Sequence, residues 1–210
     1  MRPFIEIRAV FNRNARVIGI VAVTFLSILA ASAFVAYALL LSFPSFAGFL
    51  QNNLGSTTGF TGIPRPYTVD LYDLIFLNNI GHFWNPVRVW VWIPLIGLFS
   101  LGFELALNAI VIGGVISFAT LTKGGAFTIA GLAPHGVFEI PAFILEFSGL
   151  ARWHMASTRA IYAKLSGRKV DRPLLKEEVK DSLFLSILSV ALFAVAAFVE
   201  AYVTPRFLGL

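Results

Sequence analysis

The sequence contains no cysteine, so it can form neither a disulfide nor a metal site built on thiolates. Charge is also scarce, because Asp, Glu, Lys and Arg make up only 13% of the 210 residues. A typical soluble domain has about a quarter of its residues charged. Hydrophobic residues make up 58% of the chain. This composition excludes an ordinary soluble domain and predicts an all-α, polytopic membrane protein whose main partner is the lipid bilayer.

Two catalytic signatures are also missing. The chain has neither the HExxH helix motif of zinc proteases nor the GxSxG turn of serine hydrolases. It has no nucleic-acid-binding module either. We therefore expect no catalytic residues and no nucleic-acid partner, and an intramembrane metal-dependent hydrolase is the weakest of the functions that we consider.

Five apolar stretches are candidates for crossing the membrane, whose hydrocarbon core needs about 20 helical residues. A tight turn would join the second and third into a hairpin, and Pro94 would kink the second. A further amphipathic stretch, 71–84, is too short to span and predicts an interfacial or re-entrant helix. The predicted spans, all within a single membrane domain 1–210, are 17–43, 86–103, 104–121, 134–150 and 182–203.

The distribution of Lys and Arg predicts the orientation. An odd number of spans puts the two termini on opposite sides of the membrane. With the N-terminus inside, the inner segments hold twelve Lys and Arg residues, most of them in a basic, partly helical loop at 151–181. The outer segments hold four, which are Arg65, Arg88, Lys123 and Arg206. Because positive residues favour the cytoplasmic side, we expect a cytoplasmic N-terminus and an outer C-terminus.

Polar side chains interrupt the apolar stretches. His135, Glu139 and Glu146 are spaced by four and seven residues, so they lie on one face of a helix. Pro134 suits the first turn of that helix. His135 would then lie at a helix N-terminus, where the helix dipole disfavours its charged form.

Sorting by depth gives an outer group and an inner group of polar residues. The outer group is His135, Glu139, Glu200 and Asn79, and the inner group is Glu104, Asn108 and Glu146. The outer amphipathic segment also carries Asn78 and His82. A secondary inner cluster consists of Glu104 and Glu146. The main buried polar site consists of His135, Glu139, Glu200, Asn79 and Asn108.

Three interpretations of the polar residues remain open. They form a hydrogen-bonded network that fixes helix packing. Alternatively, they form a pathway for protons or ions, because ionisable groups inside a membrane usually have a function. Thirdly, His135, Glu139 and Glu200 bind zinc or another divalent metal, although one histidine with two carboxylates is a thin ligand set.

Four segments together resemble the stage II sporulation protein M family over about residues 75–205. They are NNIGHFWNPVRVWVWIPLIGLFSLG, LNAIVIGG, LAPHGVFEIPAFILEFSGL and AAFVEAYVTP. The family commonly has Asn-Gly in its third span, where this chain has Asn108-Ala109 followed by Gly113 and Gly114. The family's motif positions fall on Asn79, Asn108, Pro134, His135, Gly136, Glu139 and Glu200.

The resemblance implies an integral membrane protein of five helices. The family's namesake anchors a septal complex with two peptidoglycan-degrading partners during engulfment of the forespore. Family members also occur in archaea that make neither spores nor that wall, so the engulfment role transfers poorly. We therefore expect a non-enzymatic membrane scaffold or transport-related component, in a homo-oligomer or a membrane protein complex. A proton- or metal-ion transporter is the alternative.

Overall fold

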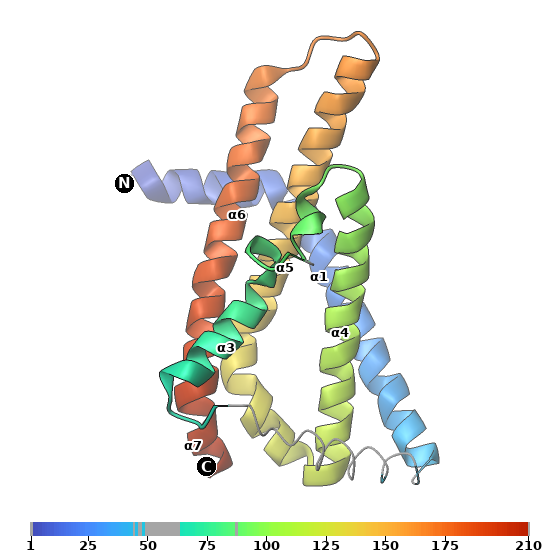
Figure 1. Ribbon diagram of the computed structural model, residues 1–210, viewed down its shortest axis with the longest axis vertical. Helices are drawn as coiled ribbons and strands as arrows, with labels where there is room; N and C mark the ends of the chain where they lie inside the picture. Colours follow the sequence, from blue (N-terminus) through green and yellow to red (C-terminus); the bar gives the residue numbers. More distant parts are fainter. Residues whose placement is uncertain (1, 44, 46–47, 49–63, 87, 210) are drawn as a thin grey trace. The chain divides into compact units, whose positions relative to one another are not determined.

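The computed structural model describes residues 2–43, 45, 48, 64–86 and 88–209 (Figure 1). The regular elements of these residues are helices and turns, with no β-strand, so the all-α prediction is confirmed. The helices are α1 (Arg2–Ser42), α3 (Val69–Asn79), α4 (Ile96–Lys123), α5 (Gly125–Leu165), α6 (Arg172–Phe198) and α7 (Thr204–Leu208). Short 3-10 turns, η1 (Gly81–Phe83) and η2 (Val89–Trp92), precede α4, and a π-helical turn, η3 (Val199–Val203), follows α6.

Within the described ranges, four helical stretches are long and apolar enough to cross a membrane. A multi-pass membrane protein is therefore supported, but the prediction of five transmembrane helices is wrong. Four is an even number, so the number of spans no longer predicts that the two termini lie on opposite sides of the membrane. The four stretches are Ile7–Ser42, Ile96–Lys123, Gly125–Leu165 and Arg172–Leu208.

The error lies in the expected hairpin between residues 103 and 104. Both residues are inside α4, which continues without a break to Lys123. The expected turn contains Gly102, but this glycine lies inside α4, because a single glycine is tolerated within a helix. The break comes earlier, at Pro94, which precedes α4 rather than kinking it, and at Leu95, which has a positive φ of 71°.

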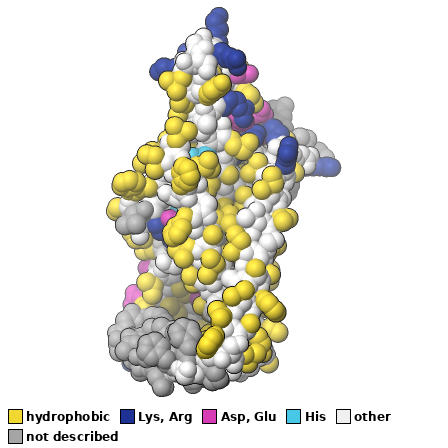
Figure 2. Space-filling model, turned by 90° about the vertical axis from the view of Figure 1, so that its right-hand side faces the viewer, with side chains coloured by type: hydrophobic (Ala, Val, Ile, Leu, Met, Phe, Trp, Pro, Cys, Tyr) yellow, Lys and Arg dark blue, Asp and Glu magenta, His cyan; other side chains and the backbone are white. Residues whose placement is uncertain are grey.

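Two glycines mark the turns between the long helices. Gly124 alone separates α4 from α5 and has a φ of +90°, which only glycine adopts without strain. Gly167 has a φ of +68° in the connection 166–171 between α5 and α6. The basic stretch 151–181 is therefore helical on both sides of a glycine stop. Figure 2 shows Lys and Arg side chains gathered at this end of α5 and α6.

The segment expected to be interfacial or re-entrant contains α3 and η1. At 11 residues, α3 is too short to cross a bilayer core. The chain is divided into two compact units, and α3 belongs to one while η1 and η2 belong to the other.

The first unit comprises Met1–Phe25, Ile80–Leu105 and Phe138–Phe193. Its centre is a group of buried phenylalanines from three helices. The rings of Phe25 in α1 and Phe193 in α6 lie 6.0 Å and 4.9 Å from the ring of Phe143 in α5. Phe143 in turn stacks on Phe147 at 6.3 Å. This aromatic core holds the helices that surround the site described below.

The second unit comprises Leu26–Asn79, Ala106–Val137 and Ala194–Leu210. In it, α1 and α4 approach closely at Gly113. A Cβ added to Gly113 would overlap Ser32 Oγ and lie 2.8 Å from the backbone nitrogen of Ala33. Ser117 donates a hydrogen bond of 2.6 Å to the carbonyl of Ala33 across the same contact. Small residues permit this approach, as is common between membrane helices.

Candidate functional site

A fully buried histidine lies in the first unit, in the irregular connection that leads to α4. His82 is in η1 and is 0% exposed. Gly81 precedes it, and a Cβ there would contact the side chain of Arg88, at 2.5 Å from Nη1. The glycine therefore lets the Arg88 side chain fold back over η1, next to the histidine.

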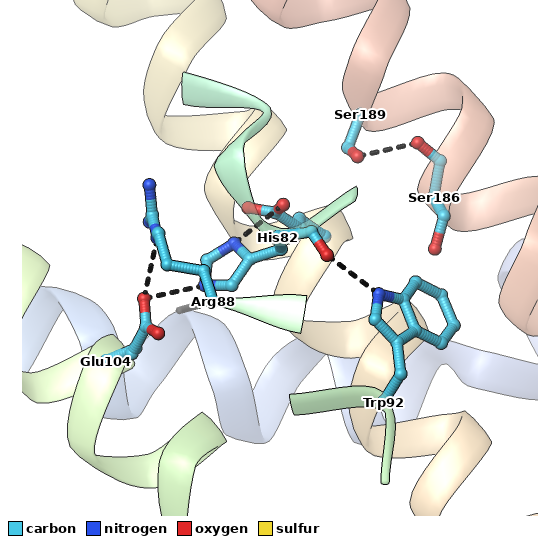
Figure 3. Close-up of polar contacts among 7 residues, drawn as sticks. His82, Arg88, Trp92, Glu104, Ser186 and Ser189 are labelled. Atoms are coloured by element: carbon cyan, nitrogen blue, oxygen red, sulfur yellow. Dashed lines mark hydrogen bonds and ion pairs between the residues drawn. The ribbon is translucent and has the colours of Figure 1, made fainter. Parts of the chain in front are cut away.

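Both ring nitrogens of His82 face carboxylate oxygens (Figure 3). Nδ1 is 2.9 Å from Oε1 of Glu146 in α5, and Nε2 is 2.8 Å from Oε2 of Glu104 in α4. Arg88 donates from Nε to the same Glu104 oxygen at 3.0 Å. Glu146 is 0% exposed, so its carboxyl group depends on His82 rather than on water.

The donors and acceptors restrict the protonation states of this network. An ionised carboxylate can only accept hydrogen bonds, whereas a neutral imidazole has one donor and one acceptor. Two contacts at His82 therefore require either an imidazolium between two carboxylates or a neutral ring beside one protonated carboxyl. With Arg88 charged, both arrangements have no net charge. In either arrangement one proton is shared within the network of His82, Glu104 and Glu146.

Side chains from the same unit also satisfy the carbonyl groups of the irregular connection. Trp92 donates from its indole nitrogen to the carbonyl of His82 at 2.9 Å. Trp153 in α5 donates to the carbonyl of Trp92 at 2.8 Å, and His154 donates to that of Val91 at 2.6 Å. Backbone outside a helix needs such partners when it is buried away from water. Together with the contacts of His82, these bonds therefore hold η1 and η2 against α4 and α5.

A cavity of about 280 Å³ lies beside Trp92. Ser186 lines it, but its buried hydroxyl faces Gly149 and has no hydrogen-bond partner among the described residues. The remaining lining side chains are apolar, so the cavity suits hydrocarbon better than a hydrated ion. They are Phe83, Trp92, Leu183, Ile187 and Val190.

In the part of the chain that the structure describes, no group of three His, Cys, Asp or Glu side chains is arranged to hold a metal ion. The two carboxylates of the network approach His82 through different ring nitrogens. The imidazole therefore lies between them, in the place where a shared metal would have to bind.

The sequence-predicted residues are distributed over both units. Glu104 and Glu146, the secondary inner cluster, are brought together through His82 in the first unit. Glu139 also belongs to the first unit. The other four members of the predicted main site belong to the second unit, and they are His135, Glu200, Asn79 and Asn108. A single polar site formed by all five of these residues remains a prediction.

His135 is not at a helix N-terminus, because α5 begins ten residues earlier, at Gly125. The dipole argument therefore fails, and Pro134 lies within the helix rather than in its first turn. His135 is buried, and its Nδ1 lies 3.4 Å from Thr204 Oγ1. Glu200 is in the π-helical turn η3 of the same unit.

The central roles of His82 and Arg88 were not predicted from the sequence. His82 was grouped with an outer segment, and Arg88 was counted as an outer positive charge. The signal was present in GHFWNPVR, where a histidine and an arginine stand six residues apart in an otherwise apolar and aromatic stretch. Their partners are 16 to 64 residues away in the sequence, so only the tertiary structure joins them.

The long apolar helices and the buried, charge-balanced network define a multi-pass helical membrane protein. The family model of stage II sporulation protein M matches residues 17–205. The chain therefore belongs to this family.

Two relatives are uncharacterized proteins of Methanocaldococcus jannaschii. One is 32% identical over 165 residues, which cover 73% of this chain and 89% of the relative. The other is 37% identical over 120 residues, which cover 57% of this chain and 52% of the relative. No solved structure matches the chain.

Proposed function

We propose that the protein is a non-enzymatic membrane scaffold, which holds partner proteins or further copies of itself within the bilayer. The observation that carries this proposal is the internal pairing of the buried ionisable groups. His82 binds Glu104 and Glu146, and the charge of the network is balanced by Arg88. Buried ionisable groups that are paired with one another keep the helices in a fixed arrangement, and a scaffold requires such an arrangement.

The surfaces of the long helices support the same proposal. In the apolar part of α1, only 11% of the residues are buried within the chain. The corresponding share in the stretch Arg172–Leu208 is 39%. Large side chains such as Phe34 in α1 are exposed, at 75%. A helix so little packed in its own chain has surface for lipid and for partner helices.

Single cysteines can test the scaffold, because the natural chain has none. We would place one at Phe34 in α1 and, as a matched control, one at the exposed Leu165 at the end of α5. Oxidation in native membranes should give a cross-linked product of defined mass from the first position only. Absence of such products from Phe34 and from other exposed positions along α1 would argue against a scaffold that uses this helix.

The alternative is a proton transporter, and one observation favours it. A chain of contacts runs from Glu146 through His82 to Glu104, and Oε2 of Glu146 is buried without a partner among the described residues. Titratable groups joined in this way can relay a proton.

Glu146→Gln separates the two functions. The amide can donate to a neutral His82, whose Nε2 can still donate to Glu104, so the shape is kept while the shared proton is lost. A transporter should carry protons into liposomes as the wild type and lose that flux in the variant. The scaffold predicts no flux above empty liposomes for either protein.

A metal site at His135, Glu139 and Glu200, for zinc or another divalent ion, stays a separate proposal. It is tested by elemental analysis of the purified protein with and without Glu139→Gln. Equal metal content in both samples would rule out this ligand set.

We also propose that the N-terminus is cytoplasmic and the C-terminus outside. Each long helix has residues in both units, and both α1 and α4 run from the first unit to the second. Four spans alone would put both termini on the same side, so this proposal requires the segment between α1 and α4, which contains α3 and η1, to carry the chain back across the membrane. Thirteen of the sixteen Lys and Arg residues belong to the first unit, which favours the cytoplasm for its charged end.

Cysteines at Ser166 and Phe207, both exposed, test this orientation. An impermeant thiol reagent applied to intact cells should label the second position and leave the first unlabelled until the cells are opened. Labelling of both positions in intact cells would mean that the stretch Arg172–Leu208 does not cross the membrane, and labelling of Ser166 alone would reverse the proposed orientation.

A further inference from the structure

A groove of about 740 Å³ lies in the first unit between the beginnings of α1 and α6. Figure 1 shows the first turns of α1 lying across α6. On the α1 side the groove is lined by Ile7, Val10 and Arg13. On the α6 side it is lined by Lys176, Lys180 and Phe184, which are spaced by four residues and so share one face of the helix.

The two carboxylates at this groove both form ion pairs with Arg13. Asp181 is buried and receives hydrogen bonds from Arg13 Nη2 at 2.6 Å and Nε at 3.0 Å, and a third from Asn14 at 2.8 Å. Glu177 lies 3.4 Å from Nη1 of the same arginine. These contacts hold α1 on α6 and leave the acidic groups of the groove occupied.

Lys176 and Lys180 differ from these two carboxylates, because neither lysine forms an ion pair with a described residue. Both are exposed, and no carboxylate of a described residue lies within ion-pairing distance of either. They therefore present two positive charges, one helical turn apart, that this part of the chain does not neutralise. An anion with several oxygen atoms can accept from both ammonium groups at once.

The groove also has an apolar wall on the side of the membrane-spanning segments. Val10 is buried in a cluster with Leu145 and Leu185, and Phe184 packs against this cluster. Along α6 the charges end at Asp181, and along α1 they end at Arg16, after which both helices continue apolar. The lysines thus stand where each helix changes from charged to apolar, which is the level of lipid headgroups.

We propose that this groove binds an anionic phospholipid. The lysine pair holds the phosphate, and the acyl chains follow Phe184 into the bilayer. The combination of paired cations with an adjoining apolar wall matches a lipid phosphate rather than a free one. Bound lipid would bridge α1 and α6 in the first unit.

The test uses the full chain in nanodiscs that contain equal amounts of phosphatidylglycerol and phosphatidylcholine, followed by native mass spectrometry of the lipid that stays bound. Three proteins are compared: the wild type, K176Q/K180Q, and the control K164Q/K169Q, which removes the same charge at the far end of α5 and the following connection. We expect the groove variant to bind phosphatidylglycerol about thirtyfold more weakly, since each basic residue near an anionic surface contributes roughly a fivefold factor. The control should bind as the wild type does.

Equal losses in both variants would show a diffuse attraction to basic residues and overturn the site. Unchanged binding in the groove variant would do so as well. Inorganic phosphate is the second probe, and binding as tight as that of phosphatidylglycerol would refute the lipid assignment, because the apolar wall would then contribute nothing. K176R/K180R keeps both charges and should retain the lipid.

Discussion

Replacement of His82 by alanine tests the central claim that this residue holds the network together. The imidazole is 0% exposed and makes contacts of 2.9 Å and 2.8 Å with Glu146 and Glu104. Its removal leaves the buried carboxyl of Glu146 without its partner. Breaking a buried ion pair by removing one member costs about 3–5 kcal/mol, whereas single hydrogen bonds between membrane helices average about 0.6 kcal/mol.

Because Glu104 keeps its ion pair with Arg88, we expect a loss near the lower end of the ion-pair range, about 3 kcal/mol. The assay is reversible unfolding in mixed micelles, followed by helical circular dichroism. Glu146→Gln is the matched control, since its amide can still bond to a neutral His82, and it should lose about 1 kcal/mol or less.

A double-mutant cycle sharpens the test. His82→Ala and Glu146→Ala should be less costly together than the sum of the single changes, with a coupling energy above about 1 kcal/mol. If His82→Ala unfolds within about 0.5 kcal/mol of the wild type, the network does not stabilise the fold and the reasoning is wrong.

Two further changes probe the backbone. Gly113→Ala should destabilise the protein by about 1–3 kcal/mol, because the added methyl group meets Ser32 and the backbone of α1. The control is Gly114→Ala, which should have little effect on the free energy of unfolding, because a Cβ at Gly114 has nothing within 4 Å. Leu95→Gly should stabilise it by about 1 kcal/mol in the same assay, because Leu95 has a φ of 71° and glycine adopts that conformation without strain. A loss of stability in this variant would mean that the leucine side chain contributes more than the backbone strain costs.

Local sequence patterns were sufficient for the class of fold and for several boundaries. The long uncharged run after Arg16 predicts the membrane-spanning part of α1, and the glycines at 124 and 167 mark two helix ends. These features depend on neighbouring residues alone, since a helix needs a continuous apolar stretch and a tight turn needs a residue that tolerates positive φ.

The misplaced hairpin had a different cause. A stretch of apolar residues from 86 to 121 is longer than one span, and length alone does not say where it divides. The division falls near Pro94, where η2 ends and α4 begins, and the preceding carbonyls are held by Trp92, Trp153 and His154. Two of these donors come from α5, so the sequence near the break does not reveal how it is stabilised.

The sequence by itself determined that this chain is a helical membrane protein with ionisable residues inside apolar segments. It also singled out Glu104 and Glu146 as a pair. Only the tertiary structure decided that His82 joins them, because Glu146 is 64 residues from His82 in the chain and reaches it through the packing of α5 beside η1. Periodicity identifies which face of one helix is polar, but a hydrogen bond between two segments depends on how they pack, and that packing is set by the aromatic core around Phe143.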